Sequence, residues 1–533
     1  MKINYVFFFL LISTVMFSQE DAWVYFNAKP NAQTYLDSPL LMLSQRALDR
    51  RTNQNIALNF SDVPLETTYV DQIKLSTGIT VMAQSKWLNA LHIRGTQVNI
   101  TALKNLTFVD KVVFANKNLN TTSKKVSETK IVQTNDKLKT TINYAYGTSA
   151  NQIQMLNGQV LHQQNYTGSG KIIAVLDAGF PNVNTSQPFQ NLISNNRILG
   201  GYDFVSRSTN FYAGDDHGTM VLSTMGGYKE NQLVGTAPDA SYYLFITEND
   251  ASENPVEESL WVEAAEKADS LGVDIITTSL GYFAYDNANY SHTYSDMNGI
   301  TNFISRGAEI AFNKGIIVVA SAGNEGNQTE KHIGGPADAV SVITVGAVTA
   351  AKVRSSFSSI GPSYDGRIKP DVMAQGTAAV VSDTSGNIIT INGTSFSCPI
   401  MAGMIACLWQ AFPTKTNQEI RDMVIQSSDK YLTPNNNYGY GIPNFGTTLG
   451  ITTFENKDFI VYPNPAKTSI SFLFSNEIND ASVSIYSILG QKVIDKKITG
   501  QNPNLSIESL KSGLYFYTFD ADGLHKTGKI IKQ

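Results

Sequence analysis

The amino-acid sequence predicts an α/β fold: a large parallel sheet covered by helices on both faces, preceded by a small α+β domain and followed by a small β-sandwich. Two observations support this prediction. Between residues 144 and 450, short β-branched or apolar runs alternate with helical patterns, which is typical of a parallel sheet buried on both faces. From residue 459 to 533, about seven strand-sized runs are separated only by turn residues, as in a small sandwich.

The amino terminus, residues 1–18, has the pattern of a signal peptide. Lys2 precedes the apolar run Val6–Ile12, and small and apolar residues follow up to Ser18. The run is too short to cross a hydrocarbon core of about 30 Å. A removed signal peptide is therefore predicted, with a retained membrane anchor as the alternative. No later segment reaches the roughly 18 uninterrupted apolar residues of a membrane-spanning helix.

Residues 21–118 are predicted to form the small α+β domain. The expected elements are strands at 23–26, 79–82 and 109–115 and a helix with a basic end at 40–51. Residues 119–143 are rich in Lys, Asn, Thr and Ser and contain few large apolar side chains. Such a segment buries too little surface to offset its chain entropy, so an exposed linker is predicted.

Residues 144–450 form the largest predicted domain. Its clearest strands are expected at 171–176, 242–246, 274–278, 315–320 and 340–345. Its helices are expected at 255–271, 304–313, 396–412 and 416–426. The sandwich at residues 459–533 is expected to contain strands at 469–474, 482–488, 492–498, 514–519 and 526–531.

Charge and cysteine content restrict the function classes. The chain has 40 Lys and Arg against 45 Asp and Glu, a net charge of −5, which argues against nucleic acid as a partner. Charged residues are only 16%, against about 25% in average globular proteins, which suggests an extracellular surface. The only cysteines, Cys398 and Cys407, form no disulfide framework. On one helix they would face opposite sides, so two buried thiols are predicted.

Two candidate catalytic residues stand at element boundaries in the central domain. Asp177 ends the apolar strand at 171–176, where parallel sheets bind ligands. His217 opens the helical run 217–226, and Gly218 beside it leaves room near the imidazole. Taken singly, each has a simpler structural interpretation, since Asp is common in turns and His at helix starts often only makes hydrogen bonds.

Asn324 and Ser395 are the other two candidates. Asn324 follows the strand at 315–320 and lies between Gly323 and Glu325-Gly326, so its side-chain amide could point into a cleft. Ser395 lies at the start of the helical run 396–412, near unpaired N–H groups and the positive end of the helix dipole. A turn Asn and an ordinary helix cap are the simpler interpretations.

All four residues stand at strand ends or helix starts of one domain, and this joint occurrence favours a shared catalytic role over the separate structural interpretations. Their chain order is Asp177, His217, Ser395. Hydrolases of the α/β-hydrolase type run Ser, acid, His and carry Gly-x-Ser-x-Gly. Here Gly393 stands two residues before Ser395, but Ser397 stands two residues after it, so that class is excluded on order and on motif.

At this point residues 153–445 resemble the subtilisin-like serine peptidases. The matching segments are Ile173–Gly179, His217–Val221, Ser279–Gly281, Val319–Gly326 and Gly393–Pro399. One departure is Ala178, where the family generally carries Thr or Ser after the acid. This departure puts a supporting hydroxyl contact in doubt, and leaves the triad itself in place.

The resemblance implies a role for each candidate. Ser395 would be the nucleophile, His217 the general base and then acid, and Asp177 the carboxylate that orients the imidazole. Asn324 and the backbone N–H of Ser395 would form the oxyanion hole. Asp215 and Asp216 are less suitable partners for His217, because adjacency in sequence does not give the contact that a triad needs. The substrate cleft would be lined by Ser279, Leu280, Gly281, Ala320, Ser321, Ala322 and Gly323.

The two flanking domains also resemble known types. Residues 21–118 look like the propeptide of this family, to be cleaved between residues 118 and 144; a permanent accessory domain is the alternative. Residues 459–533 resemble the sorting domain of the type IX secretion system of Bacteroidetes, through Tyr462–Pro465, Ser487–Lys492 and Ser512–Tyr515. A carbohydrate-binding or adhesion sandwich is the alternative reading of this tail.

The sequence therefore predicts a secreted serine endopeptidase made as a precursor. A catalytically silent binding scaffold and a peptide ligase or transpeptidase are the alternatives. The implied partners are protein or peptide substrates, the chain's own propeptide as inhibitor, and the type IX secretion machinery. No cofactor is expected. Calcium is common in the family, but no run has the Asp spacing of a defined calcium loop, so no metal site is assigned.

Overall fold

The computed structural model describes residues 18–120, 144–449, 459–462, 465–474, 481–499, 503–521 and 524–533. The chain divides into two compact units, Met1–Gly450 and Ile451–Gln533. The predicted signal peptide and linker lie outside the described residues, apart from Ser18, Leu119 and Asn120. Within the described ranges, no helix is long and apolar enough to span a bilayer.

The first unit is built around a seven-stranded sheet in the order β13-β12-β11-β10-β5-β9-β6, with every pairing parallel. The strands are β5 Ile172–Asp177, β6 Ile198–Asp203, β9 Ser241–Ile246, β10 Ile275–Thr278, β11 Ile317–Ser321, β12 Ile343–Val348 and β13 Val372–Gln375. Because β9 and β10 lie on opposite sides of β5, the chain reverses direction across the sheet there, and ligands bind at such a switch point. This confirms the predicted sheet.

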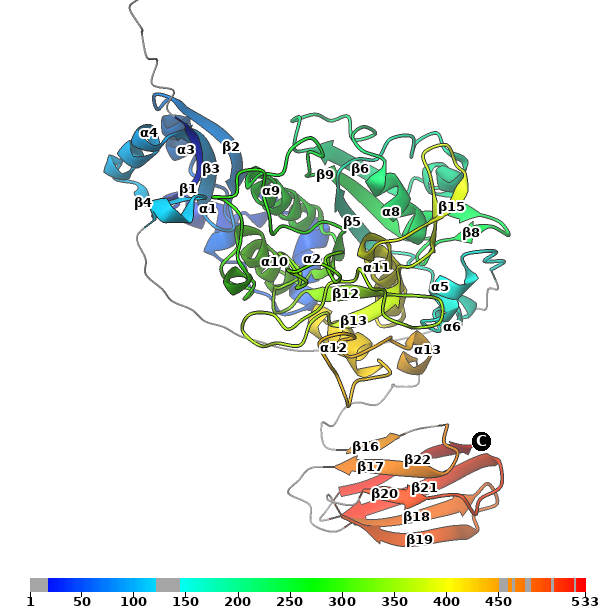
Figure 1. The fold of residues 1–533 in the computed structure, drawn as a ribbon. Helices are drawn as coiled ribbons and strands as arrows, with labels where there is room; N and C mark the ends of the chain where they lie inside the picture. The colour runs from blue at the N-terminus through cyan, green and yellow to red at the C-terminus, as the bar shows by residue number, and fades with distance from the viewer. Residues whose placement is uncertain are drawn as a thin grey trace, which may run out of the picture. The chain divides into compact units, whose positions relative to one another are not determined.

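Helices cover both faces of the sheet (Figure 1). Alternate residues of β5 pack into the two layers. Ile173 and Val175 pack into the core that contains α8, His217–Gly226, and α11, Thr394–Ala411. Ala174 and Leu176 pack into the core that contains α9, Val256–Leu271, and α10, Phe303–Asn313. The near-continuous apolar run of a parallel strand therefore fills both layers.

Smaller elements complete the central domain around this three-layer core. Thr416 caps α12 with a reciprocal pair of bonds to Glu419, which sets where that helix begins. The helices are α5 Ala150–Gln154, α6 Gln159–Gln163, α7 Gln190–Ser194, α12 Asn417–Gln426 and α13 Phe445–Thr448. Two hairpins join β7 Tyr228–Lys229 to β8 Leu233–Val234, and β14 Ala379–Ser382 to β15 Ile388–Ile391.

The amino-terminal part of the same unit holds an antiparallel sheet in the order β2-β3-β1-β4. Its strands are β1 Gln19–Phe26, β2 Ile79–Ser85, β3 Ala90–Thr96 and β4 Val109–Phe114. Alternate residues of β1 serve two cores. Ala22 and Val24 pack into the core of this sheet, together with residues of α3, Thr67–Lys74, and α4, Gln97–Ala102, whereas Trp23 and Tyr25 pack into the core around α9 and α10.

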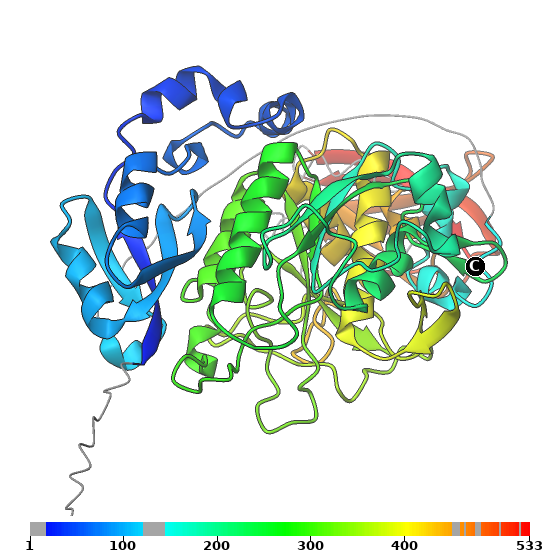
Figure 2. The ribbon, with the colours of Figure 1, turned by 90° about the horizontal axis from the view of Figure 1, so that it is seen from above.

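The predicted helix 40–51 starts later than expected. Pro39–Leu41 form a short 3-10 turn, and α2 runs over Gln45–Asn53 because Ser44 caps it: the Oγ of Ser44 accepts the N–H of Ala47 at 3.2 Å. A further short helix, α1, spans Ala32–Asp37. Figure 2 shows these two helices beside, and not within, the four-stranded sheet.

The second unit is a small sandwich of two antiparallel sheets, in the orders β16-β17-β20 and β19-β18-β21-β22. The strands are β16 Phe459–Tyr462, β17 Ser469–Phe474, β18 Ala481–Ser487, β19 Lys492–Ile498, β20 Asn504–Ser506, β21 Gly513–Ala521 and β22 Leu524–Lys532. Ile470 and Phe472 from one sheet pack with Val483, Ile485 and Phe519 from the other. The sandwich predicted from the turn spacing is confirmed.

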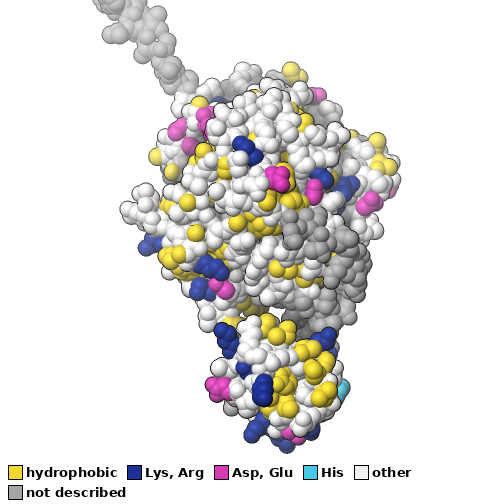
Figure 3. Space-filling view, turned by 90° about the vertical axis from the view of Figure 1, so that its right-hand side faces the viewer, with side chains coloured by type: hydrophobic (Ala, Val, Ile, Leu, Met, Phe, Trp, Pro, Cys, Tyr) yellow, Lys and Arg dark blue, Asp and Glu magenta, His cyan; other side chains and the backbone are white. Residues whose placement is uncertain are grey.

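The surface charges and the state of the two cysteines agree with what the composition predicts. Figure 3 shows a face on which charged side chains are scattered among uncharged ones, as the charged fraction of 16% implies. Cys398 and Cys407 are both free and fully buried in α11, which confirms the expected pair of buried thiols.

Candidate active site

Asp177 and His217 meet at the carboxyl end of the sheet. Asp177 is the last residue of β5 and is fully buried, and His217 is the first residue of α8. His217 Nδ1 donates to Asp177 Oδ1 at 2.7 Å. Gly218 makes this approach sterically feasible, since a Cβ there would lie 2.3 Å from Gly179 O and 3.0 Å from Asp177 Cβ.

The electrostatics of this pair set the protonation of the imidazole. Burial alone would lower the pKa of His217, but the neighbouring Asp177 carboxylate, through its charge and its hydrogen bond, raises it to about 9. Asp177 Oδ1 also accepts the N–H of Ala178 at 2.8 Å. The other oxygen, Oδ2, is buried and has no hydrogen-bond partner among the described residues. Ala178 has no hydroxyl to offer that oxygen, which agrees with the contact that the sequence put in doubt.

Asp215 has a different contact. Its Oδ1 accepts the backbone N–H of His217 at 2.9 Å, so it stabilises the start of α8 and does not bind the imidazole. Asp216 is exposed and makes no capping hydrogen bond through its side chain. Glu248 and Asp215 also act on His217 through their charges, but among the described residues Asp177 is the carboxylate hydrogen-bonded to its ring.

Ser395 lies in the first turn of α11 and is 8% exposed. Pro399 shapes its surroundings, because proline has no N–H to donate to the carbonyl four residues earlier, which belongs to Ser395. That carbonyl instead accepts from Ser279 Oγ at 2.7 Å. In return Ser395 Oγ donates to the carbonyl of Ser279 at 3.4 Å. The loop after β10 and the start of α11 are therefore held together at this residue.

Asn324 is exposed, three residues beyond the end of β11. Its Oδ1 accepts both the backbone N–H and the Oγ1–H of Thr394, each at 3.0 Å. With the oxygen held in this way, the NH₂ group remains available as a donor next to the start of α11. Gly323 before it has φ +98°, and a Cβ there would lie 2.8 Å from Ser359 Oγ, so this turn requires glycine.

The predicted cleft segments follow β10 and β11 at the same edge of the sheet. Ser279 and Leu280 are buried, whereas Gly281 is exposed and nothing lies closer than 4.0 Å to a Cβ built there. Tyr282, directly after it, pairs with Gly335 through two backbone hydrogen bonds of 2.8 and 3.1 Å. The other predicted cleft residues, Ala320–Gly323, end β11 and lead to Asn324.

Asp177, His217, Asn324 and Ser395 all lie at the carboxyl edge of the parallel sheet. Among the described residues, the contact between His217 and Ser395 is the one that is not formed. The rings of His217 and Phe396 lie 5.8 Å apart, which places the start of α8 beside that of α11. No hydrogen bond joins His217 to Ser395 among the described residues; such bonds are often long before substrate binds. The sequence did not reveal the roles of Ser279 Oγ and Thr394, because both are tertiary contacts with no local signature.

Within the described ranges, no group of three or more His, Cys, Asp or Glu side chains is placed to hold a metal ion. The expectation that the protein needs no cofactor stays a prediction.

Comparison with protein families gives three matches along the chain. The subtilase family matches residues 168–441, just over half of the chain. A peptidase S8 propeptide domain of Bacteroidota matches residues 21–133. A secretion system C-terminal sorting domain matches residues 460–533, which indicates export to the outside of the cell or to its surface.

Individual relatives agree with the family match. Subtilisin NAT of Bacillus subtilis subsp. natto is 33% identical over 295 residues, covering 55% of this chain and 69% of the relative. Subtilisin of Bacillus pumilus is 32% identical over 295 residues, covering 55% and 95%. Serine protease AprX of Bacillus subtilis (strain 168) is 29% identical over 318 residues, covering 54% and 67%. The chain thus belongs to the subtilase family of serine endopeptidases.

Proposed function

We propose that this protein is a secreted endopeptidase that hydrolyses peptide bonds through an acyl-enzyme on Ser395. The observation that carries the proposal is the 2.7 Å hydrogen bond between His217 Nδ1 and the buried Asp177, at the sheet edge where Ser395 opens α11. This bond fixes the ring so that Nε2 is the atom free to take a proton.

The proposed mechanism gives each of the four residues a part in the reaction. His217 Nε2 takes the Ser395 Oγ proton as Oγ attacks the substrate carbonyl carbon, and Asp177 stabilises the imidazolium that forms. The negative charge on the carbonyl oxygen is accepted by the Asn324 NH₂ and the backbone N–H of Ser395, near the positive end of α11. His217 then protonates the leaving amine, and water attacks the acyl-enzyme by the same steps in reverse.

The exposed position of Gly281, at the sheet edge where residues 320–323 also end β11, supports a binding mode for the substrate. We propose that an extended peptide adds to these segments as a strand, which aligns its scissile carbonyl with Ser395. The precursor is proposed to become active when the chain is cut between residues 118 and 144. The secretion machinery that reads the sorting domain and the amino-terminal domain acting as inhibitor are the proposed partners.

A fluorophosphonate probe tests the chemistry. After removal of the amino-terminal domain, the probe is expected to label one residue, which peptide mapping by mass spectrometry assigns to Ser395 and not to Ser397. The same preparation is expected to cleave casein to free peptides. Products longer than the added peptides, formed by acyl transfer to an amine, would indicate a ligase. Absence of both labelling and cleavage would contradict the proposal.

Asn324→Ala is expected to lower kcat by about 10²- to 10³-fold and to change KM little. This magnitude is the one known for the equivalent amide of subtilisin, and the reason is that the donor acts mainly on the charge of the transition state. Steady-state kinetics on a chromogenic peptide measures it. The matched control is Asn437→Ala, an exposed turn asparagine whose side chain accepts no bond from the site, which is expected to leave kcat unchanged. A rise in KM alone for Asn324→Ala would refute the oxyanion role.

A further inference from the structure

Residues 38–62 form a segment, here called the arm, that lies outside the core of the amino-terminal domain. The apolar core of the four-stranded sheet contains residues of β1 to β4, α3 and α4, and none from the arm. The arm instead folds against the central domain, with α2 at its middle (Figure 2). Lys29, 4% exposed, joins it to the sheet by donating to the carbonyls of Phe60 and Lys86 at 2.9 and 2.7 Å.

The arm docks at the sheet edge opposite to the catalytic residues. It contacts the ends of α9 and α10 and the loops that lead into β10 and β11. The N–H of Ser44 donates to Ser270 O at 2.8 Å, and Arg46 Nη2 pairs with Asp274 at 2.5 Å. Asp177, by contrast, stands at the carboxyl end of β5. The arm therefore does not block the site itself.

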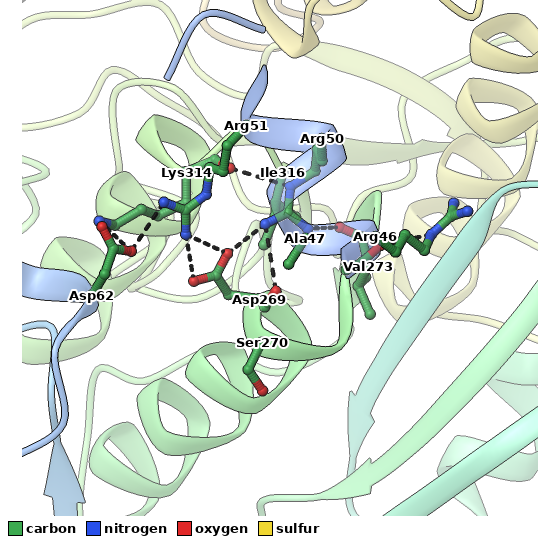
Figure 4. Close-up of polar contacts among 12 residues, drawn as sticks. Arg46, Ala47, Arg50, Arg51, Asp62, Asp269, Ser270, Val273, Lys314 and Ile316 are labelled. Atoms are coloured by element: carbon green, nitrogen blue, oxygen red, sulfur yellow. Dashed lines mark hydrogen bonds and ion pairs between the residues drawn. The ribbon is translucent and has the colours of Figure 1, made fainter. Parts of the chain in front are cut away.

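A buried ion network holds the arm in place (Figure 4). Arg50 and Arg51 of the arm both pair with Asp269 at the end of α9, the latter at 2.7 Å. Asp62 of the arm pairs with Arg51 at 2.9 Å and with Lys314, at the end of α10, at 2.8 Å. None of these five side chains is more than 4% exposed. Burial would raise the pKa of Asp269, but the guanidinium groups of Arg51 and Arg50 bring it below its ordinary value.

Backbone contacts complete the fit. Arg50 Nη1 donates to Val273 O at 2.5 Å, and Gln54 Nε2 donates to Gly315 O at 2.8 Å while its Oε1 accepts the N–H of Asn417 at 2.9 Å. A Cβ added to Gly272 would lie 2.8 Å from Arg46 Cβ, and one added to Gly315 would lie 2.8 Å from Gln54 Nε2. The docking surface and the arm are thus matched in shape as well as in charge.

A separate contact joins the sheet of the amino-terminal domain to α9. There Glu266 accepts from Ser85 Oγ at 2.6 Å and from the N–H of Trp87 at 2.9 Å, and Trp23 Nε1 donates to Ser259 Oγ at 2.8 Å. The domain is therefore attached by its sheet as well as by the arm, and among the described residues the buried network of opposite charges on both partners lies in the arm contact.

We propose that the arm is a second anchor that keeps the amino-terminal domain bound to the central domain after the chain between them is cut, so that release requires this anchor to open. The proposal rests on the cleavage step of the proposed function. Its physical basis is that separation would leave Asp269 and Lys314 on one side, and Arg50, Arg51 and Asp62 on the other, without the partners that now balance their charges.

The test uses the full chain with Ser395→Ala, so that its outcome does not depend on hydrolytic activity. A recognition sequence for a site-specific protease is inserted between residues 120 and 144, the chain is cut, and loss of the amino-terminal fragment is followed by size-exclusion chromatography after dilution. Without a substitution in the arm, the two fragments of the cut chain are expected to elute together for hours. Arg51→Met is expected to speed dissociation by about 10²-fold or more, since one partner of a buried ion network is removed.

Two further variants make the result specific. Asp269→Asn alters the central domain's partner in the same ion network and is expected to speed release to a similar extent. Because this variant leaves the amino-terminal domain unchanged, a matching result shows that faster release in Arg51→Met does not come from misfolding of that domain. The control is Lys117→Ala, which breaks an exposed ion pair with Asp296 between the same two domains, with Lys117 43% exposed. Its release rate is expected to change less than about threefold.

Two results would overturn the proposal. One is release of the unaltered fragment within the column run at nanomolar concentration. The other is equal release rates for Arg51→Met, Asp269→Asn and the unaltered chain. If instead the anchor behaves as proposed but active protein with Ser395 fails to cut casein, the proposed function fails while the arm's role stands.

Discussion

Replacing Ser395 by alanine is expected to lower kcat for peptide hydrolysis by about 10⁶-fold. That is the size of the loss when the nucleophile of subtilisin is removed, and it leaves the residual rate that binding and the oxyanion donors supply. The expectation applies here because Ser395 Oγ lies at the start of α11, next to the carbonyl of Ser279, at the edge that also holds Asp177 and His217. Stopped assays over days, with a sensitive fluorogenic peptide, measure the residual rate.

Ser397→Ala is the matched control for this variant. Ser397 is two residues later in α11, is fully buried, and donates to Thr394 O at 3.0 Å. Its loss removes one local hydrogen bond, so kcat is expected to stay within about tenfold of the unaltered enzyme. A Ser395→Ala variant that keeps more than about a thousandth of the activity would show that another group is the nucleophile.

Asp177→Asn is expected to lower kcat by about 10⁴-fold and to shift the pH profile to lower pH. The first effect has the size known for the orienting carboxylate of serine-protease triads. The second follows from the pKa of His217, which Asp177 raises to about 9. Only the neutral imidazole acts as the base, so kcat/KM of the unaltered enzyme should fall as pH drops below about 9. Without the carboxylate the pKa falls, so the residual activity should persist to lower pH.

Profiles of kcat/KM from about pH 5 to about pH 10.5 measure this shift, because they report the groups of the free enzyme. Asp216→Asn is the control: this exposed carboxylate makes no capping bond through its side chain, and its profile should overlie that of the unaltered enzyme. An unchanged apparent pKa in Asp177→Asn would mean that Asp177 does not set the protonation of His217.

Much of the sheet could be predicted because its strands are locally distinctive. The runs at β5, β10, β11 and β12 are rich in β-branched or apolar residues and fully buried, and β9 is rich in aromatic and apolar residues. Besides the short hairpin strands β7, β8, β14 and β15, three strands of the two main sheets were not predicted. β6 carries Gly200 and Gly201, β13 is only four residues long, and β3 contains His92 and Arg94, whose ring and guanidinium pair with Asp21 across the sheet.

The positions of the site residues along the chain could also be predicted, since each follows a strand or opens a helix. The contacts between these residues could not be predicted from the sequence. The contact between Ser279 and Ser395 spans 116 positions of the chain, and it exists because Pro399 leaves a helix carbonyl without its usual donor. The orientation of the Asn324 amide likewise depends on Thr394, 70 positions away. Such contacts are products of the packing of whole elements and leave no periodic trace.

By itself, then, the sequence determined which segments are strands and helices, where the chemistry-bearing residues stand on them, and which family pattern they share. The tertiary structure alone decided which charges are buried. Arg50 and Arg51 appear in the sequence only as the basic end of a helix, yet they are buried against Asp269, more than 200 positions away. The reason is physical: local patterns set the backbone conformation, but desolvated charges are stable only beside opposite charges that the completed fold brings to them.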